Sequence, residues 1–327
     1  MVGSTLIMNH LLAILLVIRV LCIGNSFSWD AVEQELVPLC KEAGVEVEVH
    51  NLYYGGCSLL QHAEFMLKDT AAYSHRVCTN AMPRLVKDTI SLRQALHERK
   101  YDYISFQQAS HDSGIRASYE PWLTMLIDTV RAYQPKAQLC WLQTWSYSQD
   151  ATHWAYEYYH NDQQEMYDSI MACLPADLQI IPCGTAIQNA RKTKLGDTLC
   201  RDGYHLNYIY GRYTASCVWY EILTGKDVRR NGYRNPKMTR AQQQLTQGAA
   251  HDANTKQTVE LSCNLHCQAC CDKVMKNIAY EKGVKDIVCD LPNKKVTVTY
   301  DPRKNDIASL LKAFDRIAKP ATIVHWR

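Results

Sequence analysis

The pattern of apolar and polar positions over the first 230 residues predicts strands and helices that follow one another in turn. Short runs rich in apolar or β-branched residues have the length of strands, and they lie at residues 18–23, 45–52, 103–106, 138–142 and 178–182. Segments with apolar residues at helical spacing separate them, at residues 31–43, 85–98, 121–133, 155–173 and 208–223. Strands that alternate with helices are typical of a parallel sheet covered on both faces. We therefore expect an α/β domain over residues 18–237, with its functional residues in the loops that follow the strands.

The pattern changes after residue 237. Residues 238–256 are rich in Gln and Ala and poor in large apolar side chains, which favours a linker. The segment that follows, residues 257–327, shows the pattern of a strand, a helix, two strands, a helix and a strand. This βαββαβ order is typical of a ferredoxin-like fold, so we predict a small α+β domain joined to the larger one.

The composition agrees with a folded protein and excludes several classes. Of the 327 residues, 47% are apolar, which excludes an intrinsically disordered chain. A formal net charge of +3 gives no electrostatic basis for binding nucleic acid. The apolar N-terminal segment, residues 1–17, has an apolar run too short to span a bilayer, so we expect no transmembrane span. The run has the length of a signal-peptide core, but no Lys or Arg precedes it, and export stays open.

Fourteen cysteines are unevenly distributed along the chain. Nine of them precede residue 220, mostly within apolar runs, and we expect these to be buried in a reduced protein. The other five lie within 27 residues near the C-terminus: Cys263, Cys267, Cys270, Cys271 and Cys289. Reduced thiols favour a cytoplasmic location over an exported one.

A serine nucleophile is the first candidate chemistry. Ser26 follows the first predicted strand and precedes the first predicted helix, where the helix dipole favours a developing negative charge. Asp202 and His205 lie three residues apart, so one turn can bring the carboxylate onto the imidazole. Either motif alone is more often a helix cap or a surface pair, but the two stand at opposite ends of one predicted α/β domain. We therefore predict a triad of Ser26, His205 and Asp202, in which the Ser26 N–H also contributes to an oxyanion hole.

The motifs that carry these residues resemble those of the SGNH (GDSL-like) hydrolase superfamily. The segment GNSFS around Ser26 resembles its nucleophile block, and DGYH, which holds Asp202 and His205, resembles its last block. Gly56, after the second predicted strand, matches the glycine of the second block. The third block departs from the family pattern, because FQQASHD contains no Gly-x-Asn-Asp. The resemblance covers roughly residues 18–225 and is closest to uncharacterised SGNH-like proteins of gut bacteria that carry the GNSFS and QQASH segments.

This resemblance implies a flavodoxin-like three-layer fold and a serine esterase that needs no cofactor for its chemistry. Ser26 would attack an ester carbonyl with His205 as general base. The N–H groups of Ser26 and Gly56 and the side-chain amide of Gln108 would hold the oxyanion. Gln107 and His111 are the alternatives to Gln108 within the altered block. Members of the superfamily hydrolyse small acyl esters of sugars and lipids as well as thioesters, so the substrate class stays open, with an acetyl ester as the first candidate.

Aromatic residues crowd the end of the fourth predicted strand and the segment after it. They are Trp141, Trp145, Tyr147, Trp154, Tyr156, Tyr158 and Tyr159. We favour ordinary packing for this cluster, and a platform for a sugar ring is the alternative that points to a carbohydrate ester. Cys57 follows Gly56 but has no local base partner, so we expect it to be structural rather than a nucleophile.

A pair of thiols at a predicted helix start is the second candidate chemistry. Cys267 and Cys270 are separated by two residues, so both can face one ion, and the helix dipole favours their thiolate forms. Thiolates suit Cu(I), with Zn(II) and Hg(II) as alternatives. The loop resembles that of the heavy-metal-associated domain, Gly-Met-x-Cys-x-x-Cys, although Asn264 and Leu265 replace its Gly and Met. This resemblance covers about residues 257–327. We hypothesise that the domain senses, stores or exchanges metal, or docks to a metal-handling partner.

Two functions follow from these two sites. The first is a serine esterase that carries a soft-metal-binding module. The second is a metal-trafficking or metal-sensing protein whose large domain has lost catalysis and serves for binding, an alternative that the altered third block supports. Nothing in the sequence couples the two domains, and ester turnover that depends on Ser26 separates the two functions.

Overall fold

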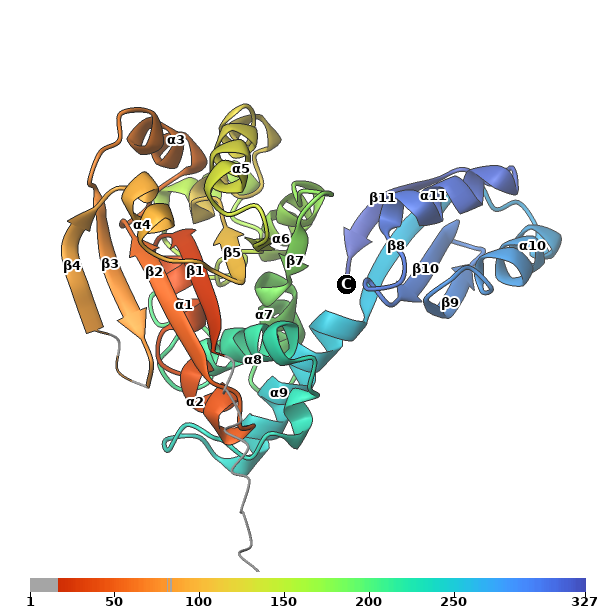
Figure 1. Ribbon diagram of the computed structural model, residues 1–327. Helices are drawn as coiled ribbons and strands as arrows, with labels where there is room; N and C mark the ends of the chain where they lie inside the picture. The colour runs from red at the N-terminus through yellow and green to blue at the C-terminus, as the bar shows by residue number, and fades with distance from the viewer. Residues whose placement is uncertain (1–16, 81, 83) are drawn as a thin grey trace, which may run out of the picture.

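The computed structural model describes residues 17–80, 82 and 84–327, so nearly all of the predicted N-terminal segment lies outside it. A seven-stranded sheet with the order β4-β3-β2-β1-β5-β6-β7 forms the centre of the large domain (Figure 1). The strands are β1 (Ile18–Gly24), β2 (Val47–Tyr53), β3 (Tyr73–Cys78), β4 (Arg84–Ile90), β5 (Tyr103–Phe106), β6 (Gln138–Leu142) and β7 (Gln179–Ile181). The pairs β1–β2, β1–β5, β5–β6 and β6–β7 are parallel, and β3 and β4 add antiparallel pairs at one edge.

Helices cover both faces of this sheet, which confirms the predicted α/β class. Alternate residues of β1 point to opposite faces, so Val20 and Cys22 enter one apolar core while Leu21 and Ile23 enter the other. The first core packs against α1 (Ser26–Val32), α2 (Leu36–Glu42), α7 (Cys183–Arg191), α8 (Gly211–Thr224) and α9 (Arg240–Thr255). The second packs against α3 (Leu59–Leu67), α4 (Leu92–Glu98) and α5 (Trp122–Tyr133). The remaining helical segments are η1 (Ser110–Asp112), η2 (Arg116–Ser118), η3 (Trp154–Tyr159), α6 (Gln163–Ala172) and η4 (Val228–Arg230).

The C-terminal residues form a separate small domain with the predicted βαββαβ order. Its elements are β8 (Gln257–Cys263), α10 (Gln268–Ile278), β9 (Val284–Asp290), β10 (Lys295–Tyr300), α11 (Ile307–Arg316) and β11 (Ala321–Trp326). The strands pair antiparallel in the order β11-β8-β10-β9. Both helices bury one face against this sheet, through Val274 and Ile278 of α10 and Leu310 and Phe314 of α11.

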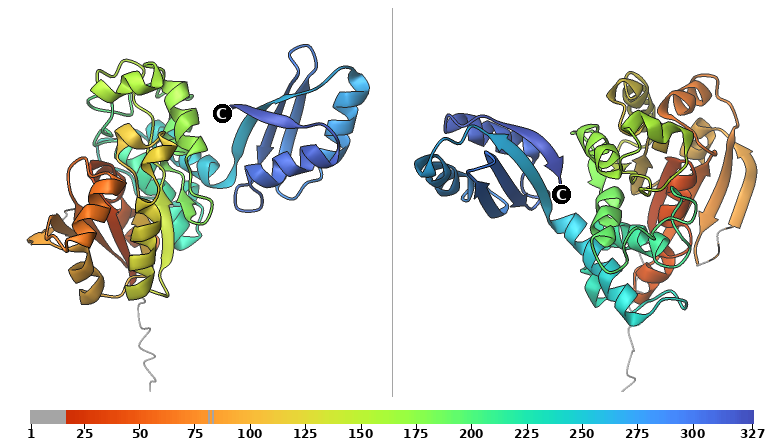
Figure 2. Two further views of the ribbon diagram at one scale, coloured as in Figure 1. Left: turned by 90° about the horizontal axis from the view of Figure 1, so that it is seen from above. Right: turned by 180° about the vertical axis from the view of Figure 1, so that it is seen from behind.

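The two domains meet through α6 and β11, and α9 runs directly into β8 (Figure 2). Asp168 of α6 accepts hydrogen bonds from the His325 ring (2.8 Å) and the Trp326 N–H (2.7 Å). Because Trp326 pairs with Val259 and Ala321 pairs with Cys263, this contact lies at the start of β8. The loop that follows Cys263 therefore lies at the far end of the small domain, away from the large one.

The predicted linker is wrong, because residues 240–255 form helix α9. Thr239 and Gln242 form a capping box at its start, and the helix packs against α7 and α8. Its polar residues are used internally: Gln243 donates to the Tyr233 carbonyl (3.0 Å), and Gln247 donates to the Asn231 carbonyl (3.0 Å). Glutamines that satisfy buried carbonyls make a packed helix look polar in the sequence.

Two further element predictions are wrong. Residues 84–90 form the edge strand β4 rather than the start of a helix, and only 92–98 are helical. The predicted helix at 155–173 is split into η3 and α6, because His160 and Asn161 adopt left-handed backbone angles (φ 49° and 55°) that an α-helix does not allow. β3 and α7 were not expected from the pattern.

All fourteen cysteines are free. Of the nine in the large domain, eight are buried and Cys200 is half-buried, which agrees with the expectation of packed thiols. Within the described part of the chain, none of the helices combines the length and the apolar character needed to cross a bilayer.

The capping box of α9 provides a test of the helix that replaces the predicted linker. Thr239→Ala removes the hydroxyl that accepts the Gln242 N–H (3.2 Å), so we expect the free energy of unfolding to fall by about 1 kcal/mol. Urea unfolding followed by tryptophan fluorescence measures this change. Thr239→Ser keeps the acceptor and should retain most of the stability. An unchanged Thr239→Ala midpoint would mean that this cap contributes little to the stability of α9.

Candidate active site and thiol pair

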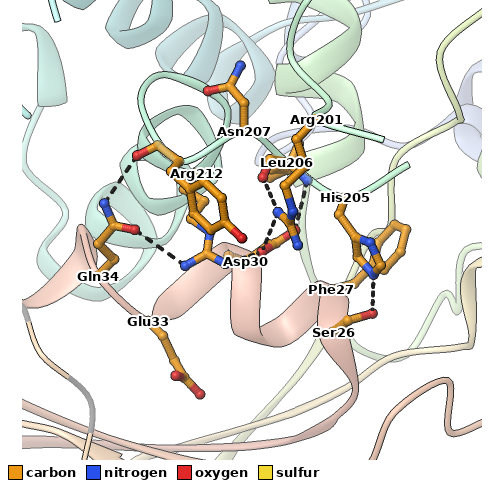
Figure 3. Close-up of polar contacts among 12 residues, drawn as sticks. Ser26, Phe27, Asp30, Glu33, Gln34, Arg201, His205, Leu206, Asn207 and Arg212 are labelled. Atoms are coloured by element: carbon orange, nitrogen blue, oxygen red, sulfur yellow. Dashed lines mark hydrogen bonds and ion pairs between the residues drawn. The ribbon is translucent and has the colours of Figure 1, made fainter. Parts of the chain in front are cut away.

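The structure brings Ser26, His205 and Asp202 together as a hydrogen-bonded chain. The Ser26 Oγ lies 2.9 Å from His205 Nε2, a contact drawn in Figure 3, and His205 Nδ1 lies 2.7 Å from Asp202 Oδ2. An imidazole with its proton on Nδ1 donates to the carboxylate and leaves Nε2 to accept the serine hydroxyl. Ser26 is half-buried and His205 has a side chain only 18% exposed, so the site is open to solvent at its edge.

Ser26 is placed by the junction between β1 and α1. Asn25 caps the helix, because its Oδ1 accepts the Phe27 N–H (2.9 Å). Gly24 is required just before it, since a Cβ there would lie 2.6 Å from Gln107 Oε1 and 2.5 Å from Ser28 Oγ. Ser26 is therefore the first residue of a helix that follows the carboxyl end of a central parallel strand, as the sequence predicts.

Asp202 orients His205 through three hydrogen bonds. Its Oδ1 accepts the N–H groups of His205 (2.7 Å) and Tyr204 (3.2 Å), while Oδ2 faces the imidazole. Partial burial would raise the pKa of Asp202, but these hydrogen bonds and the imidazole charge outweigh it and lower the pKa. The carboxylate is thus kept ionised, and an ionised carboxylate in this position would stabilise a protonated imidazole.

Gly56 lies in the turn after β2 and is held close to the nucleophile. Asn25 Nδ2 donates to the carbonyl of Cys57 (3.0 Å), which ties this turn to the residue before Ser26. Gly56 has φ 66°, a left-handed angle that glycine adopts at little cost. Its N–H has no acceptor among the described residues, so it is free to serve as an oxyanion donor.

The predicted oxyanion role of Gln108 does not agree with its hydrogen bonds. Its Oε1 accepts the N–H groups of Leu59 (2.9 Å) and Ala109 (2.8 Å), and its Nε2 donates to Ser118. Gln108 is fully buried and holds loops together, because both ends of its amide are used inside the protein. The alternative Gln107 is also used, since its Nε2 donates to Asn25 Oδ1 (2.6 Å).

The other alternative, His111, lies in an aromatic wall that reaches the triad. The Tyr204 ring contacts the His205 ring (centroids 4.2 Å apart) and the His153 ring (4.9 Å). Trp154 stacks on His153 (5.4 Å) and contacts His111 (5.5 Å). Burial, together with the charges of His111 and His205, lowers the pKa of His153, so the neutral form of this ring is favoured.

The predicted aromatic cluster divides into a buried and an exposed part. Trp154 is 60% exposed and Tyr158 is 50% exposed, and their rings meet edge to face at 5.7 Å. The other five residues are buried: Trp141, Trp145, Tyr147, Tyr156 and Tyr159. Packing therefore accounts for most of the cluster, and two adjacent rings remain free on the surface. Cys57 is buried, and burial raises the pKa of its thiol, which fits a structural role.

The second site, the thiol pair, lies in the loop between β8 and α10. Cys267 occupies the N-cap position of α10 and is exposed, and its Sγ lies 3.5 Å from the Sγ of Cys270. The ammonium of Lys319 donates to Cys270 Sγ (3.0 Å) and is the largest cause that lowers the pKa of this thiol, to about 6. Cys267 is the exposed thiol of this domain, Cys270 and Cys289 are half-buried, and Cys263 and Cys271 are buried. Two adjacent thiols, one of them largely a thiolate at neutral pH, fit a soft metal ion.

The comparisons with known proteins divide the chain near the junction of α9 and β8, where the structure also divides it into two domains. Residues 19–253 match the family described as "Domain of unknown function (DUF4886)", and residues 261–319 match the heavy-metal-associated domain. The chain therefore belongs to the DUF4886 family and carries a C-terminal heavy-metal-associated domain, which supports metal binding. None of the curated proteins matches it.

Solved structures resemble each part. A DUF4886 family protein from Bacteroides uniformis ATCC 8492 is 39% identical, with 72% of this chain and 94% of that chain covered and a TM-score of 0.70. Oxidized MerP from Ralstonia metallidurans CH34 is 30% identical over 21% of this chain and 96% of its own, with a TM-score of 0.20. The copper(I)-loaded first domain of a human copper chaperone is 22% identical over 22% of this chain and 99% of its own, with a TM-score of 0.21.

The contact between Lys319 and Cys270 predicts a pH-dependent reactivity in the metal-free protein. Alkylation of Cys270 by iodoacetamide should be half-maximal near pH 6, since the thiolate reacts and the thiol below that pH does not. Lys319→Met removes the ammonium, so the midpoint should rise toward the ordinary thiol range. Tandem mass spectrometry locates the modified cysteine. Lys312→Met, on an exposed turn of α11, is the control and should not move the midpoint, and an equal response of both variants would contradict the assignment.

Proposed function

We propose that the large domain is a serine esterase that acts on small acyl esters. The observation that carries this proposal is the continuous chain from Asp202 through His205 to Ser26, with contacts of 2.7 and 2.9 Å. Its three members come from a strand end and from a loop far away in the sequence, and neither motif alone requires them to meet. A buried packing role would not explain a half-buried serine hydroxyl aimed at an oriented imidazole.

In the proposed reaction, His205 Nε2 takes the proton of the Ser26 hydroxyl while Oγ attacks the ester carbonyl carbon. The resulting oxyanion is stabilised by the N–H groups of Ser26 and Gly56, and each such donor contributes about 3–4 kcal/mol to lowering the barrier. Protonated His205 then gives its proton to the departing alcohol, which leaves Ser26 acylated. Water attacks the acyl-enzyme with His205 again as base, and release of the acid restores the serine.

A carbohydrate ester, with acetyl as the first candidate acyl group, is the proposed substrate class. The exposed faces of Trp154 and Tyr158 support this choice, because aromatic rings of this kind present apolar area that the CH faces of a sugar ring can contact. They stand beside His153, and His153 and Tyr204 connect them to His205 through ring contacts. A sugar that stacks on Trp154 would therefore be separated from the His205 imidazole by two rings, those of His153 and Tyr204.

We propose that the small domain binds Cu(I) through Cys267 and Cys270, with Zn(II) and Hg(II) as weaker candidates. The adjacent sulfur pair and the thiolate character of Cys270 support this assignment. The metal ion would serve as cargo rather than take part in ester hydrolysis, since the loop lies at the end of the domain opposite the contact with α6. That position leaves the loop accessible to a metal-handling protein.

A binding-only large domain is the alternative function. It is favoured by one observation, that the amides of both Gln107 and Gln108 are used inside the protein. The oxyanion would then be held by backbone N–H groups alone, which is a weaker arrangement than one with an added side-chain donor. In that case the chain would be a metal-trafficking or metal-sensing protein.

Ser26→Ala tests the esterase. Hydrolysis of p-nitrophenyl acetate by the full chain should fall by about 1,000-fold or more in kcat/KM, because no other group can form the acyl-enzyme. Ser262→Ala, on the exposed face of β8, is the matched control and should retain the rate. Equal and negligible rates for wild type and Ser26→Ala, on this ester and on acetylated xylo-oligosaccharides, would favour the binding-only alternative.

Replacing both ligand cysteines tests the metal site. Wild type should compete with bicinchoninate for one equivalent of Cu(I) under reducing conditions, and the Cys267→Ser/Cys270→Ser variant should lose this equivalent. Cys289→Ser removes a half-buried thiol of the same domain and should keep it. If the double variant bound Cu(I) as tightly as wild type, other thiols would have to be the ligands.

A further inference from the structure

We propose that Asp30 is a positioning residue of the active site, which fixes the loop of His205 onto the nucleophile helix and favours the protonated imidazole through its charge. This inference rests on the proposed esterase function. Asp30 lies on α1 four residues after Ser26, so the two side chains are one helical turn apart. Figure 3 shows Asp30 between Arg212 on one side and Arg201 on the other, on the helix that carries Ser26.

The backbone next to His205 is bound directly by this carboxylate. Asp30 Oδ2 accepts the N–H of Leu206 at 2.7 Å, and Leu206 is the residue that follows the catalytic histidine. The loop itself is closed by a bridge between Cys200 and Leu206 and by the Arg201 N–H, which donates to the His205 carbonyl (2.8 Å). A single carboxylate thus anchors a closed loop to the helix that carries the nucleophile.

Two arginines complete the clamp from two other elements. Arg201, in the loop, contacts Asp30 Oδ2 at 3.1 Å, and Arg212, on α8, contacts Asp30 Oδ1 at 2.6 Å. Arg201 also donates to the carbonyl of Leu206. Both the N–H and the carbonyl of Leu206 are therefore hydrogen-bonded within this clamp. Asp30 is 2% exposed, and ion pairs in such a position hold a geometry more strongly than exposed ones.

The charge of Asp30 also acts on the imidazole. Burial raises the pKa of Asp30, while the charges of Arg212, Arg201 and His205 act in the opposite direction. The groups next to His205 are Asp202, the Ser26 hydroxyl and the rings of Tyr204 and Phe27, and His153 lies beyond Tyr204. Asp202 and Asp30 are thus the two carboxylates that favour the imidazolium formed during acyl transfer. Asp202 contacts the imidazole directly, whereas Asp30 contacts the backbone of the next residue, Leu206, and acts on the imidazole only through its charge.

The test compares Asp30→Asn with Glu33→Gln in the full chain. Glu33 is a second buried carboxylate at the end of α1, paired with Arg76 at 2.8 Å, and it makes no hydrogen bond to the loop of residues 201–206. Asp30→Asn should lower kcat for p-nitrophenyl acetate by about 10- to 100-fold with a smaller change in KM. It should also move the acid limb of the pH–rate profile to lower pH by roughly half a unit, because two arginines then face the imidazole without their counter-charge. Glu33→Gln should leave the acid limb in place.

Arg201→Gln separates charge from loosening of the loop. It breaks the same clamp but removes a positive charge, so it should shift the acid limb in the opposite direction to Asp30→Asn while it also lowers kcat. NMR of ¹⁵N-labelled imidazole, with the His205 signal identified by its loss in His205→Gln, gives the same protonation midpoint without any turnover. It therefore keeps the inference testable if one variant is too unstable for kinetics.

The outcomes distinguish this inference from the function on which it rests. Shifts of opposite sign in Asp30→Asn and Arg201→Gln, with none in Glu33→Gln, would support the positioning role. An unmoved His205 midpoint in Asp30→Asn would overturn it, even if Ser26-dependent turnover were intact. Absence of turnover in wild type, together with the predicted NMR shifts, would instead refute the esterase while the electrostatic link between Asp30 and His205 stood.

Discussion

The geometry of the candidate active site depends on the hydrogen bonds of the Asn25 side chain. Its Oδ1 accepts the Phe27 N–H and an amide proton of Gln107, and its Nδ2 donates to the carbonyl of Cys57. These partners follow β1, β5 and β2, so one amide group ties together the carboxyl ends of three adjacent parallel strands. A side-chain amide has an oxygen that can accept two hydrogen bonds and a separate nitrogen that donates, so Asn fits this position at the end of β1.

The short helix α1 connects that strand junction to the rest of the active site. Its first residue is Ser26, the proposed nucleophile, and one turn later Asp30 binds the loop that carries His205. The carboxylate lies between arginines from the loop and from α8. Removing these charges from water costs desolvation free energy, and the ion pairs formed in return hold two distant segments together. The triad is therefore held by the same core that stabilises the domain, rather than by local turns alone.

The two domains share a contact but keep their chemistries apart. Asp168 of α6 binds the last residues of β11, and the antiparallel register places the Cys267 loop at the opposite end of the small domain. The helix that holds this contact follows η3, which carries Trp154. The proposed soft-metal site and the proposed ester site of the α/β domain therefore share no common group.

The sequence by itself determined the α/β class, the βαββαβ domain and the residues of both candidate sites, because these depend on local patterns: apolar periodicity, strand-to-helix junctions and the spacing of Asp202 from His205 or Cys267 from Cys270. Only the tertiary structure decided what depends on partners far away in the chain. Gln108 was expected to donate to an oxyanion, yet its amide is used by Leu59 and Ser118. The segment expected to be a linker is a helix whose glutamines satisfy buried carbonyls. Asp30 left no local signal, because its partner Arg201 lies 171 residues away, and the energy of a buried ion pair depends on proximity in space rather than in sequence.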